Sequence, residues 1–80
     1  MTNEQIFDKL REIVVDKLAC PGEDVVMTTN FIEDLGADSL YLNEIVYEME
    51  EQFGIKVADS DFEKLRTIEQ AVNYISEKVN

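Results

Sequence analysis

The chain has 80 residues, 45 % of them hydrophobic, and 18 acidic against 7 basic side chains give it a net charge of −11. This length predicts one domain, residues 1–80, with a small core. The charge repels nucleic-acid phosphates and anionic membranes, so a nucleic-acid-binding role is excluded. The single cysteine, Cys20, excludes an internal disulfide and fits a reducing compartment. Because we find no apolar stretch of membrane-spanning length and no signal-peptide pattern at the start, we expect a cytoplasmic protein.

Hydrophobic residues first recur at helical spacing between Ile6 and Leu18. Thr2 and Gln5 form a capping-box pattern at the start of this segment. The string Cys20-Pro21-Gly22 predicts its end, because proline cannot continue the backbone hydrogen-bond ladder. The buried face of this first helix is predicted to hold Ile6, Leu10, Ile13, Val14 and Leu18.

A long connection of residues 23–37 follows, without regular periodicity. A connection of this length indicates either a functional segment or disorder. Five of its residues are hydrophobic, so we expect the segment to pack onto the core: Val25, Val26, Phe31, Ile32 and Leu35.

The second helix is predicted to open at Asp38 and to end at Gly54, since aspartate is a favoured N-cap and glycine a favoured C-cap. Its predicted buried stripe is Leu42, Ile45, Val46, Met49 and Phe53.

Two further helices are predicted after Gly54. A short one, capped by Asp59 or Ser60, would run through Phe62 and Leu65. Thr67 and Gln70 then repeat the capping-box pattern, and the last helix would bury Ile68, Ala71, Val72, Ile75 and Val79. The whole pattern predicts an all-α fold: a small four-helix bundle with a long first loop and a short third helix.

Ser39 stands directly after the predicted cap, Asp38, at the start of the second helix. A serine becomes a nucleophile when a neighbouring base removes its proton, and this chain has no histidine to do so. The missing histidine and the lone cysteine also exclude the common zinc sites. We therefore expect no catalytic residue and no metal site. Ser39 is instead predicted to be modified by another enzyme, since a helix N-terminus favours an attached phosphate.

Acidic residues dominate the centre of the chain, where no lysine or arginine occurs between Lys17 and Lys56. Segregated charge of this kind indicates a recognition surface for basic partners, although an ordinary solvated helix face is the alternative.

The string Leu35-Gly36-Ala37-Asp38-Ser39-Leu40, followed by the acidic helix with Glu44, Glu50, Glu51 and Phe53, resembles acyl carrier proteins of the fatty-acid and polyketide type, and the resemblance covers nearly the full length. It implies that a phosphopantetheinyl transferase moves 4′-phosphopantetheine from coenzyme A onto the Ser39 hydroxyl, with Asp38 as cap and part of the motif. The thiol of the arm would hold acyl groups as thioesters. The protein would be a monomeric, non-catalytic carrier.

By the same resemblance, acyl-processing enzymes with basic patches would dock on the second helix, at Leu40, Tyr41, Glu44, Tyr47, Glu48 and Glu51. An acyl chain could fold back into a space lined by Phe31, Leu42, Ile45, Val46, Met49, Val57, Phe62, Leu65, Ile68 and Ile75, although for each of these ordinary core packing is the alternative.

Four residues depart from the fatty-acid pattern: Tyr41 replaces an acid, Asn43 a β-branched apolar residue, Tyr47 a methionine and Phe62 an alanine. We expect Phe62 to narrow the acyl space, because a ring displaces volume in a close-packed interior. The leading hypothesis is a carrier in fatty acid biosynthesis. The alternatives are a specialised carrier of polyketide, lipopeptide or other acyl transfer and, more remotely, an acidic interaction module without a prosthetic group.

Overall fold

The computed structural model describes residues 1–79 and holds three α-helices, α1 (Asn3–Leu18), α2 (Ser39–Phe53) and α3 (Ile68–Val79). Two 3-10 helices lie between them, η1 (Gly22–Asp24) and η2 (Asp59–Lys64). The predicted all-α fold with a long first loop and a short third helix is confirmed. That third helix, η2, has 3-10 rather than α geometry.

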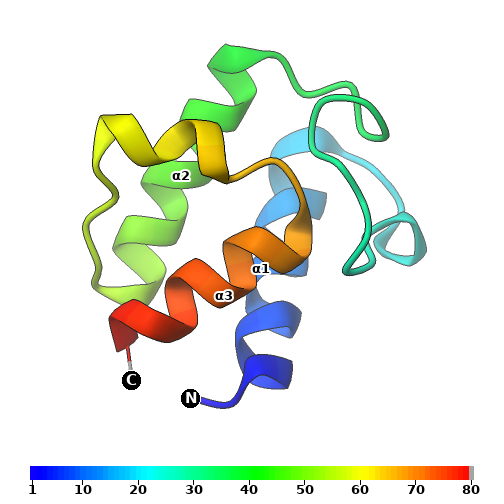
Figure 1. Cartoon of the computed structure of the whole chain (residues 1–80). Coiled ribbons are helices and arrows are strands. Elements are labelled where there is room, and N and C mark those ends of the chain that lie inside the picture. Colours follow the sequence, from blue (N-terminus) through cyan, green and yellow to red (C-terminus); the bar gives the residue numbers. More distant parts are fainter. Residues whose placement is uncertain (80) are drawn as a thin grey trace.

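Figure 1 shows α1 and α2 running in opposite directions, with α3 crossing in front of α1. Helix α1 packs against both α2 and α3. The start of α2 lies at the end of the molecule opposite to the start of α1 and the end of α3 (Figure 1). The residues around Ser39 are therefore far from both ends of the described chain.

The core is built from the stripes that the helical spacing predicts. The buried members on the three α-helices are Ile6, Leu10, Ile13, Val14, Ile45, Val46, Met49, Ile68, Ala71, Val72 and Ile75. The remaining predicted members pack against this cluster while partly exposed: Leu18, Leu42, Phe53 and Val79. The predicted second-helix stripe is thus buried in its middle and partly open at both ends.

The helix ends follow the predicted capping chemistry. The Gln5 amide donates to Thr2 Oγ1 at 3.1 Å while the Thr2 amide donates to Gln5 Oε1 at 2.9 Å, which is a complete capping box. Gly54 ends α2 in the left-handed region, at φ 65°. Helix α1 ends slightly before the predicted string, with Ala19 taking the left-handed cap position at φ 54°.

The loop between α1 and α2 packs down only in part. Val25 and Phe31 are buried and Leu35 is partly buried, but Val26 and Ile32 are 48 % and 53 % exposed, so the expectation for these two is wrong. Backbone hydrogen bonds hold this loop close to the start of α3. Where the backbone lies this near the core, one of two neighbouring side chains faces inward and the other faces solvent.

Three short backbone hydrogen bonds make that attachment. The Phe31 amide donates to the Arg66 carbonyl at 2.9 Å, and the Ile68 and Glu69 amides donate to the Thr29 and Met27 carbonyls at 3.0 and 2.9 Å. These hydrogen bonds between the loop and the start of α3 give the loop backbone some of the partners that a helix would supply.

The predicted side-chain cap of the third helix, Asp59 or Ser60, is wrong. Helix η2 has Ala58 at its N-cap position and no side-chain cap, because the Asp61 amide donates to the Ala58 carbonyl at 2.9 Å instead. The Asp61 carboxylate joins η2 to α3, because it accepts a hydrogen bond of 2.7 Å from the Tyr74 hydroxyl. A short 3-10 turn closes on its own backbone, so it needs no capping side chain.

Candidate functional site

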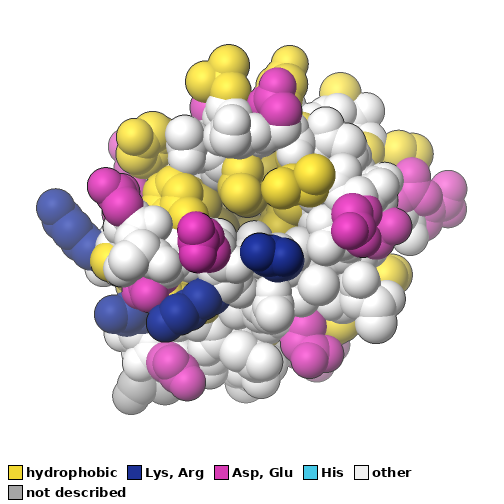
Figure 2. Space-filling view, turned by 45° about the horizontal axis from the view of Figure 1, so that its top comes forward, with side chains coloured by type: hydrophobic (Ala, Val, Ile, Leu, Met, Phe, Trp, Pro, Cys, Tyr) yellow, Lys and Arg dark blue, Asp and Glu magenta, His cyan; other side chains and the backbone are white. Residues whose placement is uncertain are grey.

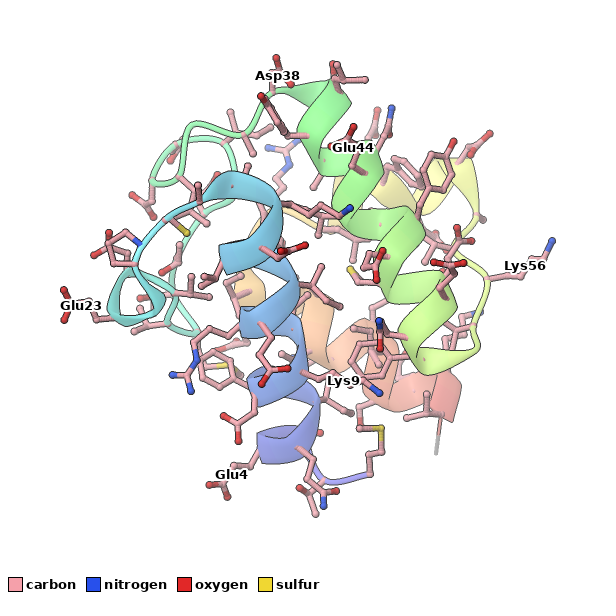
Figure 3. The ribbon with its side chains drawn as sticks, turned by 180° about the vertical axis from the view of Figure 1, so that it is seen from behind. Glu4, Lys9, Glu23, Asp38, Glu44 and Lys56 are labelled. Carbon is pink, nitrogen blue, oxygen red and sulfur yellow. The ribbon has the colours of Figure 1, made fainter. Side chains whose placement is uncertain are left out.

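Ser39 is the first residue of α2 and its side chain is exposed. Asp38 has extended backbone angles (φ −81°, ψ 179°), and its carboxylate accepts a hydrogen bond of 3.1 Å from the Tyr41 amide. The predicted N-cap role of Asp38 is therefore confirmed. Figure 3 shows Asp38 at the start of α2 and Glu44 further along the same helix.

The hydroxyl of Ser39 has no hydrogen-bond partner among the described residues. No described residue supplies a histidine, and the described residues hold no group of acidic, histidine and cysteine side chains able to bind a metal. An exposed hydroxyl without a base is a poor nucleophile by itself but is open to an enzyme that brings its own base.

The Leu35-Gly36-Ala37 turn, which precedes Ser39, is held by a buried side chain, a backbone hydrogen bond and a left-handed glycine. Ala37 is fully buried, and its amide donates to the Phe31 carbonyl at 2.9 Å. Gly36 adopts φ 69°, a left-handed conformation that glycine takes without strain. The conformation of the Leu35-Gly36-Ala37 turn thus sets the direction in which Ser39 leaves the loop.

A hollow of about 430 Å³ opens beside Ser39, between the start of α2, the loop and η2. Its apolar lining is Ile32, Leu42, Phe62 and Leu65, and its polar lining is Asn30, Glu33, Asn43, Glu63 and Arg66. Figure 2 shows hydrophobic side chains gathered on this end of the molecule, with a basic side chain at the margin and acidic ones around. A volume in this range is typical of small-molecule sites, at about 300–1,000 Å³.

The hollow covers only part of the acyl-binding space that was predicted. Leu42, Phe62 and Leu65 line it, whereas the other predicted members are closed core: Phe31, Ile45, Val46, Met49, Val57, Ile68 and Ile75. Sequence reasoning missed Ile32 and Arg66, which reach the hollow from segments that are distant along the chain. No sequence signal pointed to either residue, because both reach the hollow through the packing of the loop against the start of α3.

Four of the predicted partner-binding residues form one outward stripe on α2: Leu40, Glu44, Tyr47 and Glu51. Leu40 and Tyr47 are 65 % and 64 % exposed, and Tyr41, 45 % exposed, lies on the flank of this stripe. Glu44 and Glu51 are exposed and have no partner among the described residues. The stripe therefore offers apolar and acidic contacts together.

Glu48 is placed differently from the rest of this predicted face. Its carboxylate lies 3.9 Å from Lys17 Nζ of α1 and accepts a hydrogen bond from Gln52. Near it, Lys9 donates to the Gln52 carbonyl at 3.2 Å and lies over the Phe53 ring. The side of α2 that faces α1 is thus partly neutralised, and the free negative charge belongs to the outward stripe.

One hydrogen-bonded pair of titratable side chains joins η2 to α3. The Tyr74 hydroxyl donates to Asp61, next to Phe62, and this hydrogen bond is the main cause that lowers the pKa of Asp61 below its ordinary value. Burial is the main cause that raises the pKa of Tyr74, and the same hydrogen bond adds to it. Both shifts stabilise the pair in its native ionisation, with Asp61 charged and Tyr74 neutral.

Comparisons with known proteins show which proteins this chain is similar to. The family of the phosphopantetheine attachment site matches residues 8–75. The chain is 41 % identical to an acyl carrier protein of Petrotoga mobilis over its whole length, covering 94 % of that protein. It is likewise 41 % identical, over 91 % of its length, to an acyl carrier protein of Nitratidesulfovibrio vulgaris, of which it covers 96 %.

A solved structure extends the likeness to the fold. An acyl carrier protein of Enterococcus faecalis superposes with a TM-score of 0.81 at 35 % identity, over 98 % of this chain and 99 % of that one. No helix among the described residues is long and apolar enough to cross a bilayer. Members of this family hold phosphopantetheine and carry acyl groups without performing catalysis. The chain belongs to the family of acyl carrier proteins.

Proposed function

We propose that Ser39 is the residue to which phosphopantetheine is attached. The observation that carries this proposal is its exposed hydroxyl, without an internal partner, at the first position of a capped helix. In the attachment step, the Ser39 oxygen would attack the β-phosphorus of coenzyme A. The pyrophosphate bond breaks, 3′,5′-ADP leaves, and the hydroxyl proton passes to a base of the phosphopantetheinyl transferase.

The residues around Ser39 fit an attached phosphopantetheine. The amides of the first turn of α2 lack intrahelical acceptors, and Asp38 occupies only that of Tyr41. The helix dipole therefore favours the negative phosphodiester next to Ser39. When bound, the arm supplies a thiol that holds an acyl group as a thioester, and the hollow beside Ser39 gives that acyl group a place to shelter.

We further propose that residues 1–80 act as one monomeric carrier domain in the cytoplasm. The most favoured setting is fatty acid biosynthesis. The alternative is a specialised acyl-transfer pathway, which Tyr41, Asn43, Tyr47 and Phe62 favour: two of them alter the docking face and two line the hollow.

Acyl-processing enzymes with basic patches are the proposed partners of the α2 surface formed by Leu40, Tyr41, Glu44, Tyr47, Glu48 and Glu51. The free carboxylates of Glu44 and Glu51 support this, since complementary charge speeds encounter and selects partners without requiring tight binding. The Lys17 neighbour of Glu48 predicts a weaker contribution from that residue.

The attachment is tested by intact-protein mass. Apo protein is incubated with coenzyme A, magnesium and a broad-specificity phosphopantetheinyl transferase. We expect a gain of one phosphopantetheine in the wild type and in Ser60→Ala, an exposed serine in η2, and no gain in Ser39→Ala. An unmodified wild-type protein would instead favour the interaction module without a prosthetic group.

The pathway is tested separately with the loaded carrier. We expect fatty-acid elongation enzymes to accept the wild type. If they turn over a variant with Tyr41→Asp and Tyr47→Met much faster than the wild type, the specialised pathway becomes the better assignment. Equal turnover of both favours fatty acid biosynthesis.

A further inference from the structure

The hollow beside Ser39 differs from a plain alkyl-binding site in the polar groups on its walls. Asn43 lies one helical turn after Ser39 on the same side of α2, and both line the hollow. The Asn43 side-chain amide has no hydrogen-bond partner among the described residues. An alkyl chain placed against it would remove water from this amide and return no hydrogen bond.

Arg66 reaches the hollow from the opposite wall, between η2 and α3. Its Nε donates to the Glu63 carbonyl at 3.1 Å, which holds the guanidinium in place. In the described part of the chain, its two terminal nitrogens form neither a hydrogen bond nor an ion pair. Arg66 therefore presents donors that a bound molecule can use.

Asn30, from the loop, is the third side chain with donors at the hollow, and its group is a second amide. Its Oδ1 accepts hydrogen bonds of 2.9 Å from the Ile32 and Glu33 amides, so the oxygen is turned toward the backbone. The Nδ2 group donates to no described residue. Unused donors thus lie on three segments around one hollow.

The depth of the hollow is limited by hydrophobic side chains. Phe62 and Leu65 line it from η2 and from the residue that follows η2, and the residues beyond them are closed core. The lining combines one basic side chain, Arg66, with two acidic ones, Glu33 and Glu63. This net negative charge, on a chain of net charge −11, disfavours a carboxylate and favours a neutral oxygen.

We infer that the hollow selects short acyl groups that carry a neutral hydroxyl or keto oxygen over saturated acyl groups of the same length. Asn43 and Arg66 are the residues that determine this specificity, and Phe62 restricts chain length. A site that offers donors rejects an analogue without the matching oxygen, because its polar groups then lose water without replacement. The inference rests on the proposed attachment of the arm to Ser39.

The test measures how well the carrier protects a thioester. The holo protein is loaded with octanoyl, 3-hydroxyoctanoyl or a carboxylate-ended eight-carbon group. The rate of cleavage by hydroxylamine is divided by the rate for the same thioester on free pantetheine, which removes intrinsic reactivity. We expect the hydroxylated group to be protected about threefold to tenfold better than octanoyl, the range for one or two net hydrogen bonds, and the carboxylate-ended group least.

Matched variants show which residues cause the preference for the hydroxylated group. Asn43→Leu and Arg66→Met should each reduce the preference for the hydroxylated group, whereas Asn73→Leu on the exposed face of α3 and Arg11→Met on α1 should leave it unchanged. Circular dichroism melts check that all four variants fold.

Equal protection of octanoyl and 3-hydroxyoctanoyl would overturn the inference, as would equal effects of Asn43→Leu and Asn73→Leu. These results differ from a failure of the proposed function. If Ser39 accepts no arm, no thioester forms at all and both proposals fall. If loading succeeds without selectivity, only the inference on cargo fails.

Discussion

The two walls of the hollow are held in place by different kinds of bond. The loop wall, residues 19–38, is tied to α3 by backbone hydrogen bonds and by buried Phe31. The η2 wall is tied by side chains: Glu50 accepts from the Val57 amide at 3.0 Å, and Asp61 accepts from Tyr74 at 2.7 Å. A backbone hydrogen bond survives most side-chain substitutions, whereas a side-chain hydrogen bond is lost when that one side chain is replaced. The η2 wall is therefore the one that sequence change can adjust.

The largest effect should come from the loop wall, by removing its buried ring. Phe31→Ala should lower the free energy of unfolding by about 3–5 kcal/mol, because it leaves a cavity at a fully buried site. Urea unfolding measures this change. The neighbouring variant Ile32→Ala is the control and should cost under about 1 kcal/mol, since that side chain is half exposed. Similar costs for both variants would contradict the description of the loop wall.

The second-largest effect on stability should come from the hydrogen bond between the Val57 amide and the Glu50 carboxylate, which holds the η2 wall. Glu50→Ala should lower the free energy of unfolding by about 1–2 kcal/mol, because the amide of the buried residue Val57 loses a charge-assisted acceptor. Glu51→Ala is a matched control on the same helix, where the carboxylate is exposed and unbound, and should change stability little. If chemical denaturation shows the two variants to be alike, Glu50 does not hold η2.

The smallest effect, and the most specific, is the pH dependence of the second tie. The folded-state pKa of Asp61 is lowered from its ordinary 3.8, mainly by Tyr74, so its stabilisation is present above that value and is lost as pH falls through the lower folded pKa. The pKa of Tyr74 is raised from its ordinary 10.0, so its stabilisation is present below pH 10 and is lost as pH rises through the higher folded pKa.

Tyr74→Phe should therefore melt at a lower temperature than the wild type near neutral pH. The gap should shrink below about pH 4 and above about pH 10, near the ordinary pKa values of the two groups. Tyr47→Phe, at an exposed tyrosine, should show no such gap. Melting temperatures from pH 2 to 11 measure both variants, and a gap for Tyr74→Phe that is constant across this range would contradict a role for its hydroxyl bond to Asp61.

Some features of the fold could be predicted from the sequence and others could not. Helix ends were predictable where local chemistry decides them, as at Thr2, Asp38 and Gly54. The exposure of Val26 and Ile32 was not, because it depends on backbone bonds to α3, which are distant along the chain. The predicted cap of η2 at Asp59 or Ser60 was wrong because this 3-10 turn closes on its own backbone, where the Asp61 amide donates to the Ala58 carbonyl.

The candidate site likewise has features that adjacent residues predict and features that depend on how the helices pack. Ser39 and its cap follow from adjacent residues, and so does the outward stripe of α2, which needs only helical periodicity. The contact of Glu48 with Lys17 and the position of Arg66 at the hollow depend on how α1, η2 and α3 pack. Motifs therefore predict the attachment point, while the shape of the cargo space requires the fold.

The attachment of phosphopantetheine to Ser39 is tested most directly by locating the modification within the chain. Wild-type protein loaded by a phosphopantetheinyl transferase is digested, and the peptides are fragmented to assign the added mass to one residue. We expect the whole of the added phosphopantetheine to be on Ser39. Modification of Ser60 or another hydroxyl, with Ser39 unmodified, would contradict it.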